Sequence, residues 1–390
     1  MDGVWLDWLA FVLRFAHVVT AIAWIGASFY FIWLDLSLET PSVEKSARGL
    51  GGELWSIHGG GIYEVGKYRL APPAMPTTLH WFKWEAYSTW LTGSGLLIAL
   101  YYLRAQSYLV DPNGWVTTPG AAVAASVAYL LSGLAIYETL FRARLRPEGY
   151  AALAALMLLI AAASYVAFGL FSARAAIVHV GALLATIMAA NVFLGIIPSQ
   201  RALVAAIEAG TEPDAERALG AKLRSTHNNY FTLPVLFCML AGHAPFVFGH
   251  PHAWLLVVLI SLAAVVARHF FNRKHAGHRQ PMFLVGAAAI FVAVAFGATV
   301  VTSTNEAAAP AEDEVARLVA RHCTGCHAAQ PTQPGFAAPP GGYIFLAPAD
   351  LATHAALVTT SLTSGYMPLG NMTGMTAEER AALVAWVQAN

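Results

Sequence analysis

The segment from Arg174 to Ile197 reads RAAIVHVGALLATIMAANVFLGII and carries one charged residue, at its first position. A helix that crosses the hydrocarbon core of a bilayer needs about 20 mostly apolar residues. The many Ala and Gly residues of this segment suit close packing between helices in lipid. The segment therefore predicts a membrane-spanning helix.

Seven further apolar stretches have a comparable length. The eight predicted spans are 5–35, 79–103, 119–141, 149–171, 174–197, 229–248, 252–271 and 281–303. Only 11% of the residues are charged, whereas soluble domains average about 25%. The 22 basic residues balance the 22 acidic ones, which excludes a basic nucleic-acid-binding protein and a disordered chain. We expect eight transmembrane helices, with the lipid bilayer as a partner and no nucleic acid.

The basic residues of the loops are unevenly distributed. Two lie in even-numbered loops, Arg104 and Arg174, and fifteen lie in odd-numbered loops. The fifteen are Lys45, Arg48, Lys67, Arg69, Arg142, Arg144, Arg146, Arg201, Arg217, Lys222, Arg224, Arg268, Arg273, Lys274 and Arg279. The positive-inside rule then places the odd loops in the cytoplasm and both termini outside. This topology does not explain Arg14 and Lys83, which lie inside a span or at its start.

The chain is expected to keep its first span. Asp2 and Asp7 stand where a cleavable signal peptide carries basic residues, and no cleavage site follows a short apolar core. After the last span the composition becomes polar and rich in Ala and Pro. We predict a membrane domain at 1–303, a linker at 304–311 and a small soluble domain at 312–390.

The soluble domain contains Cys323-Thr324-Gly325-Cys326-His327, a C-x-x-C-H motif. Its two thiols can bond to haem vinyl groups while the adjacent His binds the iron. A zinc site would need a second pair of ligands, and a redox dithiol would need a βαβ context. The third cysteine, Cys238, lies inside a predicted span. The motif therefore predicts one covalent haem c, with Cys323, Cys326 and His327 as its attachment residues.

The second iron ligand is predicted to be Met367, in the run Tyr366-Met367-Pro368. A final helix follows, starting at the capping box Thr376-Ala377-Glu378-Glu379 and running through Trp386. Met372, Met375 and His354 are the alternatives. The predicted fold class is all-α: an eight-helix transmembrane bundle with a C-terminal class I-type cytochrome c domain. Because haem c is attached outside the bacterial cytoplasmic membrane, we expect a multi-pass inner-membrane protein with both termini and this domain in the periplasm.

Three histidines, His17, His179 and His243, are predicted to lie in the outer half of the membrane. Ionisable residues inside a membrane are costly and mark functional sites. The three side chains could bind the iron of a haem b or line a substrate pocket. The alternative for each is a hydrogen bond between helices.

A second group is predicted on the cytoplasmic side, where Gly-rich backbone, aromatic rings, amides and cations suit a planar, anionic heterocycle. The predicted catalytic residues are His80, Lys83, Glu85 and His227. The predicted substrate-binding residues are His58, Arg69, Trp84, Asn228, Asn229 and Tyr230. The alternatives are interfacial anchoring for Lys83 and Trp84, a turn at Gly59–Gly61, and helix capping at His227.

Four runs resemble the bacterial membrane-bound, cytochrome c-linked urate oxidases, also called urate hydroxylases. They are Arg14-Phe15-Ala16-His17, Ala23-Trp24-Ile25-Gly26, Phe82-Lys83-Trp84-Glu85-Ala86-Tyr87 and His227-Asn228-Asn229-Tyr230. The resemblance covers essentially the whole chain. It implies oxidation of urate to 5-hydroxyisourate, with electrons passed to a respiratory-chain acceptor such as a cytochrome c or a terminal oxidase.

Two other functions fit the same features. One is a quinol-linked membrane cytochrome that only transfers electrons, and the other is a purine transporter with a cytochrome domain. The cytoplasmic-side group favours binding of a small molecule over electron transfer alone. Urate oxidation removes two electrons, whereas haem c accepts one at a time, and this mismatch motivates the haem b hypothesis.

Overall fold

A computed structural model describes residues 2–142, 149–302, 309–363 and 365–390. The predicted linker lies mostly outside these residues, as do Arg144 and Arg146. A helix lies in each of the eight predicted spans. The principal helices are α1 (Asp2–Leu36), α3 (Trp84–Leu97), α5 (Pro119–Arg142), α6 (Gly149–Leu170), α7 (Ala173–Ala190), α9 (Ala215–Ala241), α11 (Ala253–His275) and α12 (Met282–Thr302). Two of them continue through π-helical turns: α3 into Ile98–Tyr102, and α7 through Asn191–Ile196 into α8 (Ile197–Glu208).

Within the described residues, five helices are long and apolar enough to cross a membrane. They are Trp5–Leu36, Pro119–Phe141, Gly149–Leu170, Ala173–Glu208 and Ala253–His275. The apolar part of α12, Met282–Ala298, is shorter. Large apolar side chains on α1 face outward, among them Trp5 at 75% exposed and Ile22 at 67%. An exposed apolar surface of this kind is typical of a helix in contact with lipid. The prediction of a multi-pass membrane protein is supported by these helices.

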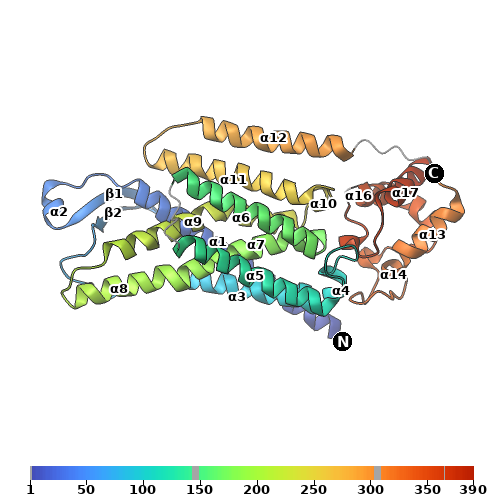
Figure 1. The fold of residues 1–390 in the computed structure, drawn as a ribbon, viewed down its shortest axis with the longest axis horizontal. Coiled ribbons are helices and arrows are strands. Elements are labelled where there is room, and N and C mark those ends of the chain that lie inside the picture. The colour runs from blue at the N-terminus through green and yellow to red at the C-terminus, as the bar shows by residue number, and fades with distance from the viewer. Residues whose placement is uncertain (1, 143–148, 303–308, 364) are drawn as a thin grey trace.

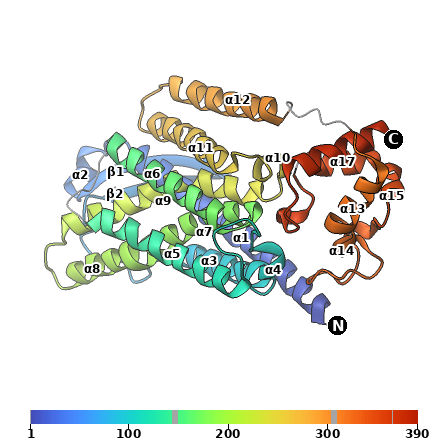
Figure 2. The same ribbon diagram turned by 45° about the vertical axis from the view of Figure 1, so that its right-hand side comes forward.

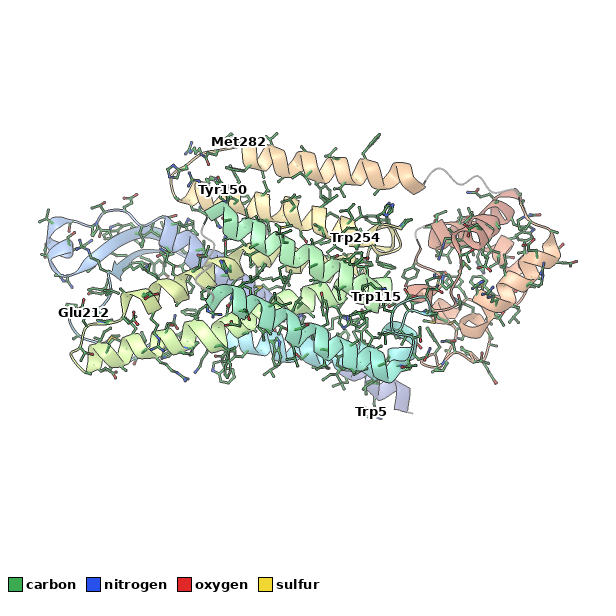
Figure 3. The ribbon with its side chains drawn as sticks, in the orientation of Figure 1. Trp5, Trp115, Tyr150, Glu212, Trp254 and Met282 are labelled. Atoms are coloured by element: carbon green, nitrogen blue, oxygen red, sulfur yellow. The ribbon has the colours of Figure 1, made fainter. Side chains whose placement is uncertain are left out.

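The helix bundle has two different ends (Figures 1 and 2). The first, fifth and seventh loops lie at one end, together with α2 (Val43–Ala47) and strands β1 and β2, whereas the residues after 308 lie at the other end. Figure 3 shows Trp5, Trp115 and Trp254 towards the second end, and Tyr150, Met282 and Glu212 towards the first. Tryptophan at helix ends suits a membrane–water interface.

The all-α prediction is wrong for residues 50–68. Strands β1 (Leu50–His58) and β2 (Gly61–Tyr68) form an antiparallel hairpin, in which His58 pairs with Gly61. The two-residue loop has φ of 57° at Gly59 and 83° at Gly60. A hairpin loop of this length favours positive φ at both positions, which glycine adopts without steric cost. Asp35 at the end of α1 anchors the hairpin by binding Lys67, and it also binds Lys222 of α9 at 2.8 Å.

Helix α7 forms the centre of the bundle. Its residues Ile177, Val180, Leu184 and Ile187 are fully buried. Small residues allow its neighbours to approach closely, since a Cβ on Gly181 would lie 2.8 Å from Cys238 Cβ. Cys238 of α9 is accordingly a buried packing residue.

Residues 309–390, here called the C-terminal part, pack around a core of their own. Its helices are α13 (Glu312–His322), α14 (Thr324–His327), α15 (Pro348–Thr353), α16 (Ala355–Thr363) and α17 (Ala377–Ala389). Core residues from different helices include Val319, Leu351 and Leu383. The predicted capping box is confirmed: the Thr376 hydroxyl accepts from Glu379 N at 3.2 Å, and the Glu379 carboxylate accepts from Thr376 N at 2.8 Å.

The C-terminal part contacts the bundle at α4 (Ala105–Tyr108). Ser107 Oγ donates a hydrogen bond to the Pro334 carbonyl at 2.5 Å. The ring of Tyr108 stacks on that of Phe336, with centroids 6.4 Å apart. A second short helix, α10 (Pro245–Phe248), lies at the same end of the bundle.

Candidate active site

The C-x-x-C-H motif lines a cavity of about 430 Å³ between the C-terminal part and the bundle, here called the thiol cavity. Cys323 precedes α14 as its N-cap, Cys326 lies within it, and His327 is its last residue. Apolar side chains from α15, α16 and α17 form much of the wall, including Leu351, Val358 and Leu383. Tyr108 and Arg174 of the bundle close the other side. The motif therefore faces an apolar cavity of the kind that a haem requires.

The hydrogen bonds of His327 suit iron coordination. Its Nδ1 lies 2.9 Å from the Tyr343 carbonyl oxygen, and its side chain is buried. A carbonyl can only accept, so Nδ1 carries the hydrogen and the Nε2 lone pair is left for a metal. A hydrogen bond of this kind fixes the ring orientation of metal-binding histidines.

Burial disfavours the ionised form of both thiols. It raises the pKa of the Cys323 thiol to about 12, and it also raises that of Cys326. Within the described residues no group of three His, Cys, Asp or Glu side chains could hold a metal ion. The residues present therefore fit a haem, which brings its own equatorial ligands, better than a bare ion.

Three methionines line the thiol cavity: Met367, Met372 and Met375. Met367 is held by Arg380 of α17, which donates to its carbonyl and, at 2.9 Å, to that of Leu362. His354 is not among the lining residues and instead contacts the rings of Tyr343 and Phe345. The assignment of Met367 as the second iron ligand stays a prediction.

A second cavity of about 510 Å³, here called the bundle cavity, lies between α1, α3, α5, α7 and α9. Its polar side chains include two of the three predicted histidines, His17 and His243, together with Arg14 and Arg174. Arg174 is also part of the thiol cavity. One side chain at the start of α7 thus borders both cavities.

The ring of His17 is fixed against α3. Its Nδ1 lies 3.0 Å from the Thr89 carbonyl oxygen and 3.1 Å from Thr92 Oγ1. The approach requires glycine at position 93, because a Cβ there would lie 2.9 Å from His17 Cε1. Since the carbonyl only accepts, Nδ1 carries the hydrogen, and the Nε2 lone pair is available to another group.

The third histidine, His179, has a different environment. It is fully buried, its Nδ1 lies 2.7 Å from the Ala175 carbonyl oxygen, and its Nε2 lies 2.7 Å from Ser126 Oγ. Its ring stacks on Phe171 at 4.2 Å. Both nitrogens are occupied by protein groups, so His179 matches the alternative reading of a helix–helix hydrogen bond. The structure does not bring the three histidines together, and they do not fit a shared haem b.

Four of the predicted cytoplasmic-side residues lie at consecutive positions in the middle of α9. His227, Asn228 and Asn229 are buried, and Tyr230 is half-buried. His227 Nδ1 contacts the Tyr137 hydroxyl at 2.9 Å, and Asn228 accepts from Asn191 at 2.8 Å. The Tyr230 hydroxyl contacts His269 Nδ1 at 2.8 Å.

Two arginines complete this region, which we call the inner polar cluster. Its members are Tyr137, Glu138, Asn191, Arg224, His227, Asn228, Asn229, Tyr230, Arg268, His269 and Asn272. Arg224 pairs with Glu138 at 2.5 Å and donates to Asn191 at 2.6 Å. Arg268 donates to Asn229 at 2.8 Å, while its guanidinium carbon lies 3.9 Å from the centroid of the Phe29 ring. These hydrogen bonds join α5, α7, α9 and α11. Five buried atoms of the cluster have no hydrogen-bond partner among the described residues: His227 Nε2, Asn229 Nδ2, Arg268 Nη2, His269 Nε2 and Asn272 Oδ1.

The other predicted cytoplasmic-side residues lie apart from this cluster. His58 and Arg69 are exposed, at the tip and the base of the hairpin, and His80 is exposed before α3. The remaining three, at the start of α3, are Lys83, Trp84 and Glu85. Trp84 is 65% exposed, and Lys83 Nζ lies 5.9 Å from the centroid of its ring. The structure does not gather these residues into one pocket with the inner polar cluster.

The family of the chain follows from a sequence comparison. The sequence model of a family described as urate oxidase N-terminal matches residues 3–299. The chain belongs to this family. The match confirms the resemblance and covers the bundle, whereas the C-terminal part lies beyond it. No match was found among curated proteins or among solved structures. Membership in the urate oxidase family suggests an oxidoreductase that acts on urate.

Sequence reasoning missed the role of Arg174. It is one of two basic residues in the even loops, and this rarity was the only available signal. Arg14 had a stronger signal, because the topology did not explain it. Arg14 and Arg174 line the same cavity although they belong to helices far apart in the sequence. No local sequence pattern predicts that two such residues come together.

Proposed function

We propose that the protein is a membrane-bound oxidoreductase that oxidises urate to 5-hydroxyisourate and passes the electrons through its own haem c. Urate and a respiratory-chain acceptor, such as a cytochrome c or a terminal oxidase, would be its partners. One observation carries the proposal: a urate oxidase family domain at residues 3–299 is joined to a C-x-x-C-H cavity that contacts it through Tyr108 and Arg174.

Haem c would be held by thioether bonds to Cys323 and Cys326, and His327 and Met367 would bind its iron. When bound, it supplies a one-electron acceptor. His327 would bind through Nε2, with its ring fixed by the Tyr343 carbonyl. The apolar walls from α15, α16 and α17 would exclude water, which together with His/Met ligation favours a high reduction potential.

The reaction requires groups for an anion and for protons. Urate is a planar anion at neutral pH, and conversion of urate and water into 5-hydroxyisourate releases two protons and two electrons. A base must take a proton at the ring, and cations or amides must hold the oxygens. The family domain contains both kinds of group in its buried and half-buried polar side chains.

We propose that all eight predicted spans cross the bacterial inner membrane and that both termini and the C-terminal part lie in the periplasm. The five long apolar helices and the placement of the first, fifth and seventh loops at one end of the bundle support this topology. The excess of basic residues in the odd loops supports the orientation.

A spectroscopic assay tests the proposed function. Urate added to oxidised, detergent-purified protein should reduce haem c, seen as the growth of its reduced absorbance bands, with two electrons removed per urate. Dithionite gives the full reduced spectrum as a reference for intact haem. Absence of urate-dependent reduction, in protein that dithionite reduces fully, would contradict the proposal and favour a quinol-linked electron carrier or a purine transporter.

A further inference from the structure

We infer that the bundle cavity, and not the inner polar cluster, binds the anionic purine, with Arg14 and Arg174 as its anion-binding groups and His17 as the base. The inference rests on the proposed function and adds the location of its substrate. The sequence-based prediction placed its catalytic and substrate-binding residues on the cytoplasmic side and left a pocket at His17, His179 and His243 as an alternative.

The charge of the cavity points to an anion. Among the described residues that line it are two guanidinium groups and no carboxylate. Arginine keeps its charge in proteins, and a cavity lined by charges of one sign attracts a ligand of the opposite sign. Arg174 Nε is buried and has no hydrogen-bond partner among the described residues. An anionic ligand would supply both the missing charge and the missing acceptor.

The inner polar cluster has a different charge balance. There Arg224 already pairs with a carboxylate, Glu138, through two hydrogen bonds of 2.5 and 2.9 Å. Arg268 already donates to Asn229 and covers the Phe29 ring. Arg224 is thus neutralised by Glu138, whereas Arg268 keeps a buried Nη2 without a hydrogen-bond partner among the described residues. The cluster therefore holds one guanidinium that no carboxylate of the described residues pairs with, whereas the bundle cavity borders two.

The size and walls of the cavity suit a planar heterocycle. Its volume of about 510 Å³ lies within the range of about 300–1,000 Å³ for small-molecule sites. Trp24, Trp90 and Tyr101 line it, and Trp90 Nε1 donates to Thr186 Oγ1 at 3.2 Å, which holds its indole in place. Aromatic side chains provide apolar faces on which a flat ring can stack.

His17 is arranged to accept a proton. Its Nδ1–H is directed at the Thr89 carbonyl, so the neutral ring presents the lone pair of Nε2. Urate and water yield 5-hydroxyisourate, two protons and two electrons. His17 Nε2 takes one proton as the new C–O bond forms at the purine ring, and solvent takes the other. The two electrons leave one at a time through the c-type haem, which the respiratory-chain acceptor would reoxidise after each transfer.

The position of the cavity favours rapid electron transfer. Arg174 borders both the bundle cavity and the thiol cavity, so a purine bound there would lie one side chain away from the acceptor. From the end of the bundle near the hairpin, electrons would have to cross most of the hydrocarbon core, which is about 30 Å thick. Electron transfer from a purine in the bundle cavity avoids this distance and needs no second haem.

Binding can be measured without turnover. In holoprotein that dithionite has already reduced, the haem cannot accept further electrons, so equilibrium dialysis with radiolabelled urate reports binding alone. We expect Arg14→Gln and Arg174→Gln each to weaken urate binding at least about tenfold, which corresponds to about 1.4 kcal/mol. Arg104→Gln is the matched control: Arg104 lies at the same end, pairs with Asp7 at 2.6 Å, and does not line the cavity.

Two further variants distinguish the loss of a specific side-chain role from the loss of folding. Arg174→Lys retains the charge and should bind urate more tightly than Arg174→Gln. His17→Gln should retain urate binding within about threefold but slow urate-dependent haem reduction by about 100-fold, the scale of a lost general base. The haem spectrum and full reduction by dithionite confirm that each variant is folded.

Different results would contradict the site assignment and the proposed function. If Arg14→Gln and Arg174→Gln bind urate as the wild type does, or if only Lys83→Gln loses binding, the site assignment is overturned, although urate still reduces the wild-type haem. If wild-type protein neither binds urate nor is reduced by it, the proposed function fails as well.

Discussion

At the scale of single residues, the partners of a histidine ring decide what the ring can do. His179 uses both nitrogens within the protein, so it serves packing. His17 and His327 each have Nδ1 against a backbone carbonyl, which leaves Nε2 for a proton or a metal. All three are equally polar residues in apolar or cysteine-rich surroundings, and the sequence alone does not distinguish them.

The same scale yields a prediction for the second iron ligand. Met367→Ala should leave haem attached through Cys323 and Cys326 but lower its reduction potential by on the order of 0.1 V, within the roughly 0.8 V range that axial ligands span. The physical reason is that a thioether ligand favours the reduced iron. A spectroelectrochemical titration of purified holoprotein measures the shift.

Met372→Ala serves as the control for this prediction. Met372 lines the same cavity, so its loss changes the packing of the cavity to a similar degree. If Met372→Ala lowered the potential and Met367→Ala did not, the ligand assignment would pass to Met372.

At the scale of elements, apolar length predicted the helices well and misjudged the loop after α1. A helix lies in every predicted span because an apolar run of this length buries its backbone polar groups only as a helix. The hairpin was missed although Ile57 and Ile62 flank a Gly59-Gly60-Gly61 run, which is a recognised hairpin signal. His58 and Arg69 were instead interpreted as substrate-binding residues, with a turn at Gly59–Gly61 as the alternative.

The capping box of α17 gives a pH-dependent prediction. The hydrogen bond from the Thr376 backbone lowers the pKa of Glu379, which also pairs with Arg321 at 3.0 Å. A lowered folded-state pKa stabilises the fold above the unfolded value of about 4.3 and loses this effect as the pH falls through the folded value. Glu379→Gln should therefore lower the free energy of unfolding of the C-terminal part by about 1 kcal/mol near neutral pH. Near pH ~3 it should change this free energy very little.

Denaturant unfolding of the C-terminal part in the full-length holoprotein, followed by haem absorbance, measures this difference. Glu314→Gln is the matched control, because it removes a first-turn carboxylate from α13 without touching the capping box. If Glu379→Gln lowered the free energy of unfolding equally at both pH values, the carboxylate charge would have no part in the cap.

The candidate site was predictable only where its residues are adjacent in sequence. Cys323, Cys326 and His327 form a continuous motif, and the structure places them on one cavity. His17 and His243 were singled out for their depth, but Arg174 and Thr89 were not, because their roles arise from packing between α1, α3 and α7. In the sequence, exposed residues such as His58 and Arg69 cannot be distinguished from residues of a buried site. Tertiary contacts decide which polar side chains are buried.

At the scale of the whole molecule, the bundle separates two chemically different ends. One end carries the hairpin and most basic loops, and the other carries the C-terminal part and both described cavities near it (Figure 1). Under the proposed orientation, the purine site and the electron acceptor would share the periplasmic side.

Cysteine labelling in whole cells tests this orientation. Asn113→Cys lies between α4 and α5, towards the C-terminal part, and Glu212→Cys lies between α8 and α9, at the opposite end (Figure 3). A membrane-impermeant maleimide that reaches the periplasm should label Asn113→Cys in intact cells, and Glu212→Cys only after permeabilisation. The native Cys238 is buried and should stay unlabelled. Reversed labelling would show that the bundle has the opposite orientation.

The contacts of Ser107 with Pro334 and of Tyr108 with Phe336 fix the C-terminal part against the bundle within one chain. A tethered acceptor faces its donor at an effective concentration on the order of millimolar, whatever the amount of protein in the membrane. Under the proposed function, the first oxidation step would be unimolecular, and only the handover to the next carrier would depend on diffusion. A cell could therefore keep few copies of the protein and still capture each electron as soon as it is released.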